Sequence, residues 1–265
     1  MKIAISANHA EKSQNVAAEL TDKLKKAGFD LDCDQPSVVI TIGGDGTLLN
    51  AFHKYSDRLD EIRFIGVHTG HLGFYTDWRD YEIDLLVESL IYETEQSVSY
   101  PLLDVILSYS DGQPDRKYIA LNEATIRNIE RTMVAEVYIR DEFFEKYRGD
   151  GLSVSTPTGS TAYSKSLGGA VVNPRVKAIQ MNEIASINNR VFRSLGSPLI
   201  IAEDDWIRID LKRDDKYQLH IDHFVESQVN LASAYFKVSD KQIHFASYRH
   251  THFWRRVNDA FIGNM

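Results

Sequence analysis

Apolar residues in the first hundred positions form short runs that alternate with stretches of helical spacing. Three runs are continuous, as in strands that are buried on both faces of a parallel sheet: residues 2–6, 37–42 and 63–67. Each is followed, directly or after a loop, by apolar residues at helical spacing: residues 16–27, 47–55 and about 81–92. This order of elements predicts a doubly wound α/β domain over residues 1–99.

After Ser99 the pattern changes to the alternation of period two that is typical of strands. We expect strands at residues 102–109, 118–127, 134–139, 152–156, 206–211, 217–221, 234–238 and 242–248. Helices are expected only near residues 160–167 and 176–184. The sequence therefore predicts a mostly β second domain over residues 100–249, and residues 250–265 could pack back on the first domain.

Composition and charge narrow the function classes. The chain has 30 basic and 38 acidic residues, a net charge of -8, which opposes the basic footprint of a general nucleic-acid binder. Its one cysteine, Cys33, allows no internal disulfide and fits a reducing compartment. No apolar run approaches the roughly 18 residues of a membrane span. We expect a cytoplasmic protein that binds neither nucleic acid nor membranes.

The segment Gly43-Gly44-Asp45-Gly46-Thr47 lies between a predicted strand and a predicted helix. Glycines allow close backbone approach, and a helix N-terminus offers free N–H groups, so this loop can hold a phosphate without basic side chains. Asp45 is then a candidate general base, although Asp-Gly also simply favours a turn. The fingerprints of P-loop and Rossmann dinucleotide-binding proteins are absent from the sequence.

A second glycine-containing segment is dense in hydroxyl groups. Arg148-Gly149-Asp150-Gly151 precedes the predicted strand at 152–156, and Thr156-Pro157-Thr158-Gly159-Ser160-Thr161-Ala162-Tyr163 follows it. One or two Ser or Thr residues would be enough to cap a helix. The remaining hydroxyls, and the ring and hydroxyl of Tyr163, are candidates for ligand contacts.

Three segments together, in this order, resemble the NAD kinase family: the loop at 43–47, the pair Asn122-Glu123, and residues 156–163 with the trailing Gly168-Gly169. A looser match is Gly66-Val67-His68-Thr69-Gly70-His71-Leu72-Gly73-Phe74. The resemblance covers at least residues 38–169. It implies a phosphofructokinase-like first domain, a dinucleotide-binding second domain, and transfer of the γ-phosphate of ATP, with Mg²⁺, to the adenosine-ribose 2′-hydroxyl of NAD. It also implies a homo-oligomer, a dimer or a tetramer.

The resemblance also implies roles for individual residues. Asp45 would activate the ribose hydroxyl, with Gly43, Gly44, Gly46 and Thr47 against the phosphate, and Asp45 and Gly46 would also touch the dinucleotide. Asn122 and Glu123 would bind base and ribose. The other implied NAD contacts are Phe74 and Tyr75 near the adenine, Thr158, Thr161, Ala162, Tyr163 and Ser166 in the adenosine pocket, Arg148 and Asp150 toward the nicotinamide half, Ala185 and Ile187, and His223 from another subunit.

Other interpretations remain open at this stage. A kinase of lipids or sugar phosphates shares the glycine loop, and a dinucleotide sensor would bind without reacting. The sequence does not separate ATP from polyphosphate as donor, or NAD from NADH as acceptor. The histidine pairs His68/His71, His220/His223 and His250/His252 lack cysteine neighbours and zinc-enzyme helical spacing, so we predict no metal site made by the protein alone.

Overall fold

The computed structural model describes residues 1–265 except 71–72, 93–96, 191, 247–252 and 264–265. The chain divides into two compact units, one made of Met1–Tyr100 with Gln242–Met265 and one made of Pro101–Lys241. Our sequence prediction put residues 242–249 in the second domain. The structure instead gives Gln242–Ala246 to the first unit, because this end of strand β17 (Leu231–Ala246) pairs in parallel with β4 (Arg63–His68).

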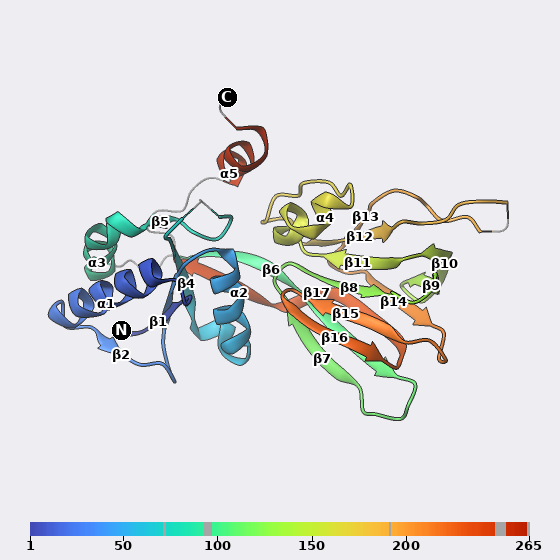
Figure 1. The fold of residues 1–265 in the computed structure, drawn as a ribbon, viewed down its shortest axis with the longest axis horizontal. Coiled ribbons are helices and arrows are strands. Elements are labelled where there is room, and N and C mark those ends of the chain that lie inside the picture. Colours follow the sequence, from blue (N-terminus) through green and yellow to red (C-terminus); the bar gives the residue numbers. More distant parts are fainter. Residues whose placement is uncertain (71–72, 93–96, 191, 247–252, 264–265) are drawn as a thin grey trace. The chain divides into compact units, whose positions relative to one another are not determined.

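The first unit is built on a parallel sheet in the order β17-β4-β3-β1-β2, and β5 also pairs with β4 (Figure 1). Its other strands are β1 (Lys2–Ala7), β2 (Asp30–Leu31), β3 (Val38–Ile42) and β5 (Trp78–Arg79). Its helices are α1 (Glu11–Lys26), α2 (Asp45–Lys54), η1 (Ser56–Glu61), η2 (Asp80–Glu82), α3 (Ile83–Ile91), α5 (Phe253–Val257) and η4 (Asn258–Ile262). Within the described residues no helix combines the length and apolarity needed to cross a membrane.

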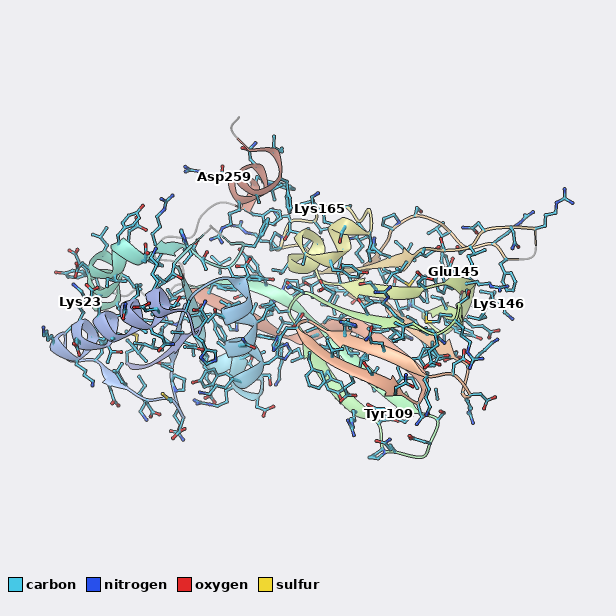
Figure 2. All side chains as sticks on the ribbon, in the orientation of Figure 1. Lys23, Tyr109, Glu145, Lys146, Lys165 and Asp259 are labelled. Carbon is cyan, nitrogen blue, oxygen red and sulfur yellow. The ribbon has the colours of Figure 1, made fainter. Side chains whose placement is uncertain are left out.

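Helices cover both faces of this sheet. Val38, Ile40 and Ile42 of β3 share one apolar core with α1 and α3. Because neighbouring strand residues point to opposite faces, Val39 lies on the other face, and α2 contacts β3 without joining that core. Lys23, labelled on α1 in Figure 2, forms an ion pair with Asp84 of α3. The predicted α/β first domain is confirmed.

The second unit consists of two antiparallel sheets around one apolar core. One sheet has the order β10-β9-β14-β17, with β6 pairing with β17 and β7; the other has the order β13-β12-β11-β8-β15-β16. The strands are β6 (Ser97–Tyr109), β7 (Arg116–Ala120), β8 (Glu123–Arg127), β9 (Met133–Ile139), β10 (Glu142–Gly149), β11 (Gly151–Ser155), β12 (Ala178–Ile184), β13 (Leu199–Ala202), β14 (Trp206–Leu211), β15 (Tyr217–Ile221) and β16 (Phe224–Val229). Two short helical turns, η3 (Thr158–Thr161) and α4 (Tyr163–Ser166), follow β11. The predicted mostly β second domain is confirmed.

The sequence analysis did not predict strand β10. In this strand, buried and more exposed residues alternate from Glu145 onward. Glu145 is 6% exposed, whereas the side chain of the next residue, Lys146, is 53% exposed. Both residues are labelled in Figure 2. Strands β13 and β16 were also not predicted. Their partly exposed apolar residues give a weak alternation, and only pairing to a neighbouring strand defines them.

The helix predicted over residues 176–184 is wrong, because Ala178–Ile184 is strand β12, paired on both sides by β11 and β13. Gln180 and Asn182 interrupt its apolar pattern, yet both are buried. Gln180 Nε2 donates to Ser164 Oγ at 3.0 Å, and Ser164 Oγ donates to Asn182 Oδ1 at 3.0 Å. These contacts bridge distant parts of the chain, so local periodicity could not reveal them.

Two other predicted strands have different bounds. Residues 118–127 form two strands, β7 and β8, rather than one. The strand pairing is interrupted at Leu121 and Asn122, whose backbone N–H groups donate to the side-chain oxygens of Asp222. Residues 234–238 and the described part of 242–248 belong to one long strand, β17.

Candidate functional site

The glycine loop follows β3 directly, at the carboxyl edge of the parallel sheet. β3 and β4 are in register up to Ile42 and Val67, and the Gly43 N–H donates to the Val67 carbonyl at 2.9 Å. The loop after β4 therefore begins at the same edge as the glycine loop. This edge is where open α/β sheets bind their ligands.

Glycine is required at two positions of this edge. Gly43 has a φ of +150°, and a Cβ there would lie 2.3 Å from Thr47 Oγ1 and 2.7 Å from Asn8 Nδ2. A Cβ on Gly73 would lie 2.1 Å from Asp45 Oδ1. Gly43 therefore leaves room for Thr47 and Asn8, and Gly73 lets the loop after β4 approach Asp45.

Asp45 is the first residue of α2 and is half-buried. Its Oδ2 accepts the backbone N–H of Phe74 at 2.9 Å, and its Oδ1 accepts that of Tyr75 at 3.1 Å. Each oxygen of a carboxylate can accept a second hydrogen bond. The carboxylate is thus fixed in direction and still able to accept a proton or a hydroxyl hydrogen.

In the second unit, Asp222 organises the Asn122-Glu123 pair. Its Oδ1 accepts the backbone N–H groups of Asn122 at 2.7 Å and Glu123 at 3.2 Å, and its Oδ2 accepts that of Leu121 at 2.9 Å. Asp222 has a φ of +51°, in the left-handed region that Asp tolerates better than most residues. This tight turn between β15 and β16 holds residues 121–123 in a fixed conformation.

Glu123 lies in an unusual environment for a carboxyl group. Burial, together with the nearby charge of Asp222, raises its pKa from 4.5 to about 8, and a hydrogen bond from the Tyr163 backbone partly opposes this shift. Its buried Oε2 has no hydrogen-bond partner among the residues that the structure describes. A cavity of about 200 Å³ is lined by Glu123, Thr125, Arg127, Tyr163, His220 and Asp222. A neutral carboxyl group at this cavity can donate a hydrogen bond as well as accept one.

The hydroxyl-rich segment is tied to the Asn122-Glu123 pair. Thr156 Oγ1 donates to the Leu121 carbonyl at 2.6 Å and accepts the Gly159 N–H at 2.9 Å. A Cβ on Gly159 would lie 2.0 Å from the Asn122 carbonyl oxygen, so the two segments touch through their backbones. Within the described part of the chain, the buried hydroxyl Oγ1 of Thr158 has no hydrogen-bond partner. These contacts bring Asn122, Glu123, Thr158 and Tyr163 together.

The comparisons with known proteins agree with this arrangement. The model of the ATP-NAD kinase N-terminal domain matches residues 3–94, and that of the C-terminal domain matches residues 121–248. The chain is 57% identical to the NAD kinase of Enterococcus faecalis over 263 residues, covering 99% of each protein. It is 54% identical to the NAD kinase of Latilactobacillus sakei, over 100% of this chain and 98% of that protein.

The chain belongs to the NAD kinase family. It is therefore a phosphotransferase rather than a non-enzymatic sensor. Two more distant solved structures share the fold. Yeast NADH kinase complexed with NADH has a TM-score of 0.86 and 21% identity, over 99% of this chain and 87% of that one. An Archaeoglobus fulgidus NAD kinase in complex with ATP has a TM-score of 0.75 and 19% identity, over 99% of this chain and 98% of that one.

Within this NAD kinase fold, the predicted residues of the second unit form two groups. Arg148, Asp150, Ala185 and Ile187 are brought together by hydrogen bonds from the Ile187 N–H to the Arg148 carbonyl at 2.7 Å and from the Asp150 N–H to the Ile184 carbonyl at 2.9 Å. This group adjoins Gly151, whereas Glu123 pairs with Ser155 at the other end of β11. A five-residue strand separates them by about 13 Å between its end residues.

The remaining predicted residues lie close to one of these groups. Thr161 and Ala162 precede Tyr163, and the exposed Ser166 donates through Oγ to the Tyr163 carbonyl at 2.7 Å. His223 is exposed and follows Asp222. His71, His250 and His252 lie outside the described residues. In the part of the chain that the structure describes, no three His, Cys, Asp or Glu side chains gather closely enough to hold a metal ion.

The sequence analysis missed Asp222, which fixes residues 121–123, and Arg256, which contacts the loop that contains Phe74. A signal for Asp222 was present, because Asp is favoured in tight turns and Asp222 directly follows the predicted strand at residues 217–221. Arg256 gave no such signal, since its partners are about 180 residues away along the chain.

Proposed function

We propose that this chain transfers the γ-phosphate of ATP to the 2′-hydroxyl of the adenosine ribose of NAD, forming NADP, with Asp45 as the general base. The observation that carries the proposal is the carboxylate of Asp45 at the glycine loop. It is oriented by the N–H groups of Phe74 and Tyr75 and retains acceptor capacity on both oxygens.

In the proposed reaction, the carboxylate of Asp45 takes the proton of the ribose 2′-hydroxyl. The oxygen's electron pair forms a bond to the γ-phosphorus, and the bond from that phosphorus to the bridging oxygen breaks, which leaves ADP. Free N–H groups at the start of α2, next to Gly44 and Gly46, stabilise the negative charge on the transferring phosphate. General-base catalysis of this kind contributes about 10²–10⁴-fold in rate.

The divalent cation belongs to the nucleotide substrate, as Mg·ATP. Mg²⁺ is usually held by substrate phosphates, waters and one or two carboxylates rather than by a cage of protein side chains. Asp45 is the carboxylate of the glycine loop, and it fits the limited part that a protein has in such coordination. When bound, the cation neutralises charge on the phosphates.

For NAD, we propose contacts from each unit: Gly46, Phe74 and Tyr75 in the first unit, and Asn122 and Glu123 in the second. A Glu123 carboxyl that stays protonated near neutral pH can donate to a ribose or base acceptor. The other proposed contacts are Thr158, Thr161, Ala162, Tyr163, Ser166, Arg148, Asp150, Ala185, Ile187 and, from a second subunit of a dimer or tetramer, His223. The NADH and ATP named for the two distant structures are ligands of the proposed classes.

The experiment is direct. The purified protein is incubated with ATP, Mg²⁺ and NAD, and NADP is detected with an NADP-specific dehydrogenase. Parallel reactions replace NAD with NADH and ATP with polyphosphate, which defines donor and acceptor. NADP formation that depends on the protein supports the proposal, and its absence with every donor and metal would refute it.

A further inference from the structure

A buried arginine of the C-terminal segment contacts the loop that supplies Asp45 with its N–H donors. Arg256, on α5, has a side chain that is 3% exposed. Its Nη1 donates to the Gly73 carbonyl at 3.4 Å and to the Phe74 carbonyl, and its Nη2 pairs with the Asp77 carboxylate. One guanidinium group therefore binds three positions of this loop. Asp259, labelled in Figure 2, marks the same C-terminal segment.

The contacts of Arg256 and Asp45 fall on the same two peptide groups. The peptide group between residues 73 and 74 contains the Gly73 carbonyl, which accepts from Arg256, and the Phe74 N–H, which donates to Asp45. The next peptide group contains the Phe74 carbonyl, which accepts from Arg256, and the Tyr75 N–H, which donates to Asp45. Because a trans peptide group is planar, fixing its oxygen also fixes the direction of its N–H.

Burial and aromatic packing strengthen the link between Arg256 and Asp45 through these two peptide groups. The side chains of Arg256 and Asp77 are 3% and 9% exposed, so water screens their charges weakly. A charged donor on a carbonyl oxygen also polarises the peptide group and strengthens its N–H as a donor. The Phe74 ring packs on Phe253 at 6.4 Å and on Phe261 at 5.6 Å between ring centroids, which adds apolar contacts between the same segments.

The geometry points to Arg256 as a positioning residue for Asp45: through the peptide groups flanking Phe74, it holds the two N–H donors that orient the carboxylate. This inference rests on the proposed role of Asp45 as general base. Arg256 itself need not touch either substrate. Its loss should therefore lower turnover far more than NAD binding.

The first test compares Arg256→Ala with Arg255→Ala, which removes an exposed arginine of the same helix. A misplaced catalytic group costs about 10²-fold, so we expect kcat to fall by that factor in Arg256→Ala, with KM for NAD changed by less than about 3-fold. Arg255→Ala should match the unsubstituted protein. Millimolar guanidinium ion, well below denaturing concentrations, should restore part of the lost kcat, whereas neutral urea of similar shape should not.

The second test is a double-mutant cycle with Asp45→Asn. If Arg256 acts through Asp45, Arg256→Ala should lower kcat by less than about 2-fold in the Asp45→Asn background. An equal loss in both backgrounds, or unchanged kcat in Arg256→Ala, would overturn the inference and leave the proposed function intact. Near-normal turnover in Asp45→Asn would instead refute the base, and the inference with it. Should Arg256→Ala fail to fold, Arg256→Lys takes its place in the same cycle.

Discussion

The two units each present a carboxyl group at a candidate binding site, and the two groups have opposite surroundings. Asp45 in the first unit is half-buried and accepts two backbone N–H groups. Glu123 in the second unit is also half-buried, beside Asp222. Its Oε2 is buried and has no hydrogen-bond partner among the described residues, and desolvation raises its pKa to about 8. The same chemical group can thus serve as an oriented acceptor in one unit and as a neutral donor in the other. Backbone geometry sets the first role, and burial sets the second.

The largest effect is expected from Asp45→Asn, which removes the acceptor function. An amide cannot act as the base, so kcat should fall about 10²–10⁴-fold. KM for NAD should change little, because the amide keeps nearly the same shape. Steady-state kinetics of NADP formation measure both values. Asp57→Asn, an exposed aspartate of the same unit, is the control and should have no effect. Near-normal turnover in Asp45→Asn would contradict the assignment.

Asp222→Ala tests the support of Glu123. It leaves three backbone N–H groups, at residues 121–123, without their acceptor. Unsatisfied buried donors are costly, so the free energy of unfolding should fall by about 3 kcal/mol. Urea unfolding measures this loss. Replacement of the exposed neighbour His223 by Ala should leave stability within about 0.5 kcal/mol. Equal stabilities for the two variants would show that the turn contributes little.

Gly73→Ala tests the placement of Asp45 without changing its chemistry. The new Cβ would lie 2.1 Å from Asp45 Oδ1, so the carboxylate or the loop must shift. Such a displacement should lower kcat by about 10²-fold. Gly70→Ala is the matched control, since no atom of the described residues lies within 4 Å of a Cβ at that position. Unchanged kcat in Gly73→Ala would mean that the position of the carboxylate is not critical.

The smallest effect concerns Glu123 and pH. Folding raises the pKa of Glu123 from 4.5 to about 8. Between these two pH values, the carboxyl group is protonated in the folded state and ionised in the unfolded state. The contribution to stability is therefore complete below pH 4.5 and is lost as the pH rises toward 8.

Glu123→Gln, which stays neutral, should remove this pH dependence and exceed the unsubstituted protein at pH 8 by about 1–3 kcal/mol. Urea unfolding at pH 5 and pH 8 provides the comparison. Asp222→Asn should reduce the same pH dependence, because the charge of Asp222 is the second cause of the shift. Identical pH dependence with and without the Glu123 carboxyl would rule out burial as a control of its charge.

Prediction from sequence succeeded where the signal is local. The parallel strands were visible as continuous apolar runs, and the position of the glycine loop between strand and helix could be predicted because its glycines lie together in the sequence. The family resemblance named Phe74 and Tyr75 only as adenine neighbours. Their hydrogen bonds to Asp45 were not predicted, since they lie about 30 residues further along the chain. Tertiary contacts cannot be seen in local periodicity. The same limit explains why buried Gln180 and Asn182 made strand β12 look like a helix.

The network of Ser164, Gln180 and Asn182 also has a thermodynamic consequence. Gln180 additionally accepts the Ala170 N–H at 2.8 Å and donates to the Ala170 carbonyl at 3.2 Å, so the chain from Ser164 to Ala170 is tied to β12 from inside the protein. A segment that is already ordered loses little conformational entropy when a ligand binds to it. Slow exchange of the backbone amide hydrogens of residues 164–170 in the ligand-free protein would indicate that this segment is rigid. Preorganisation of this kind would increase the affinity for a ligand that binds there.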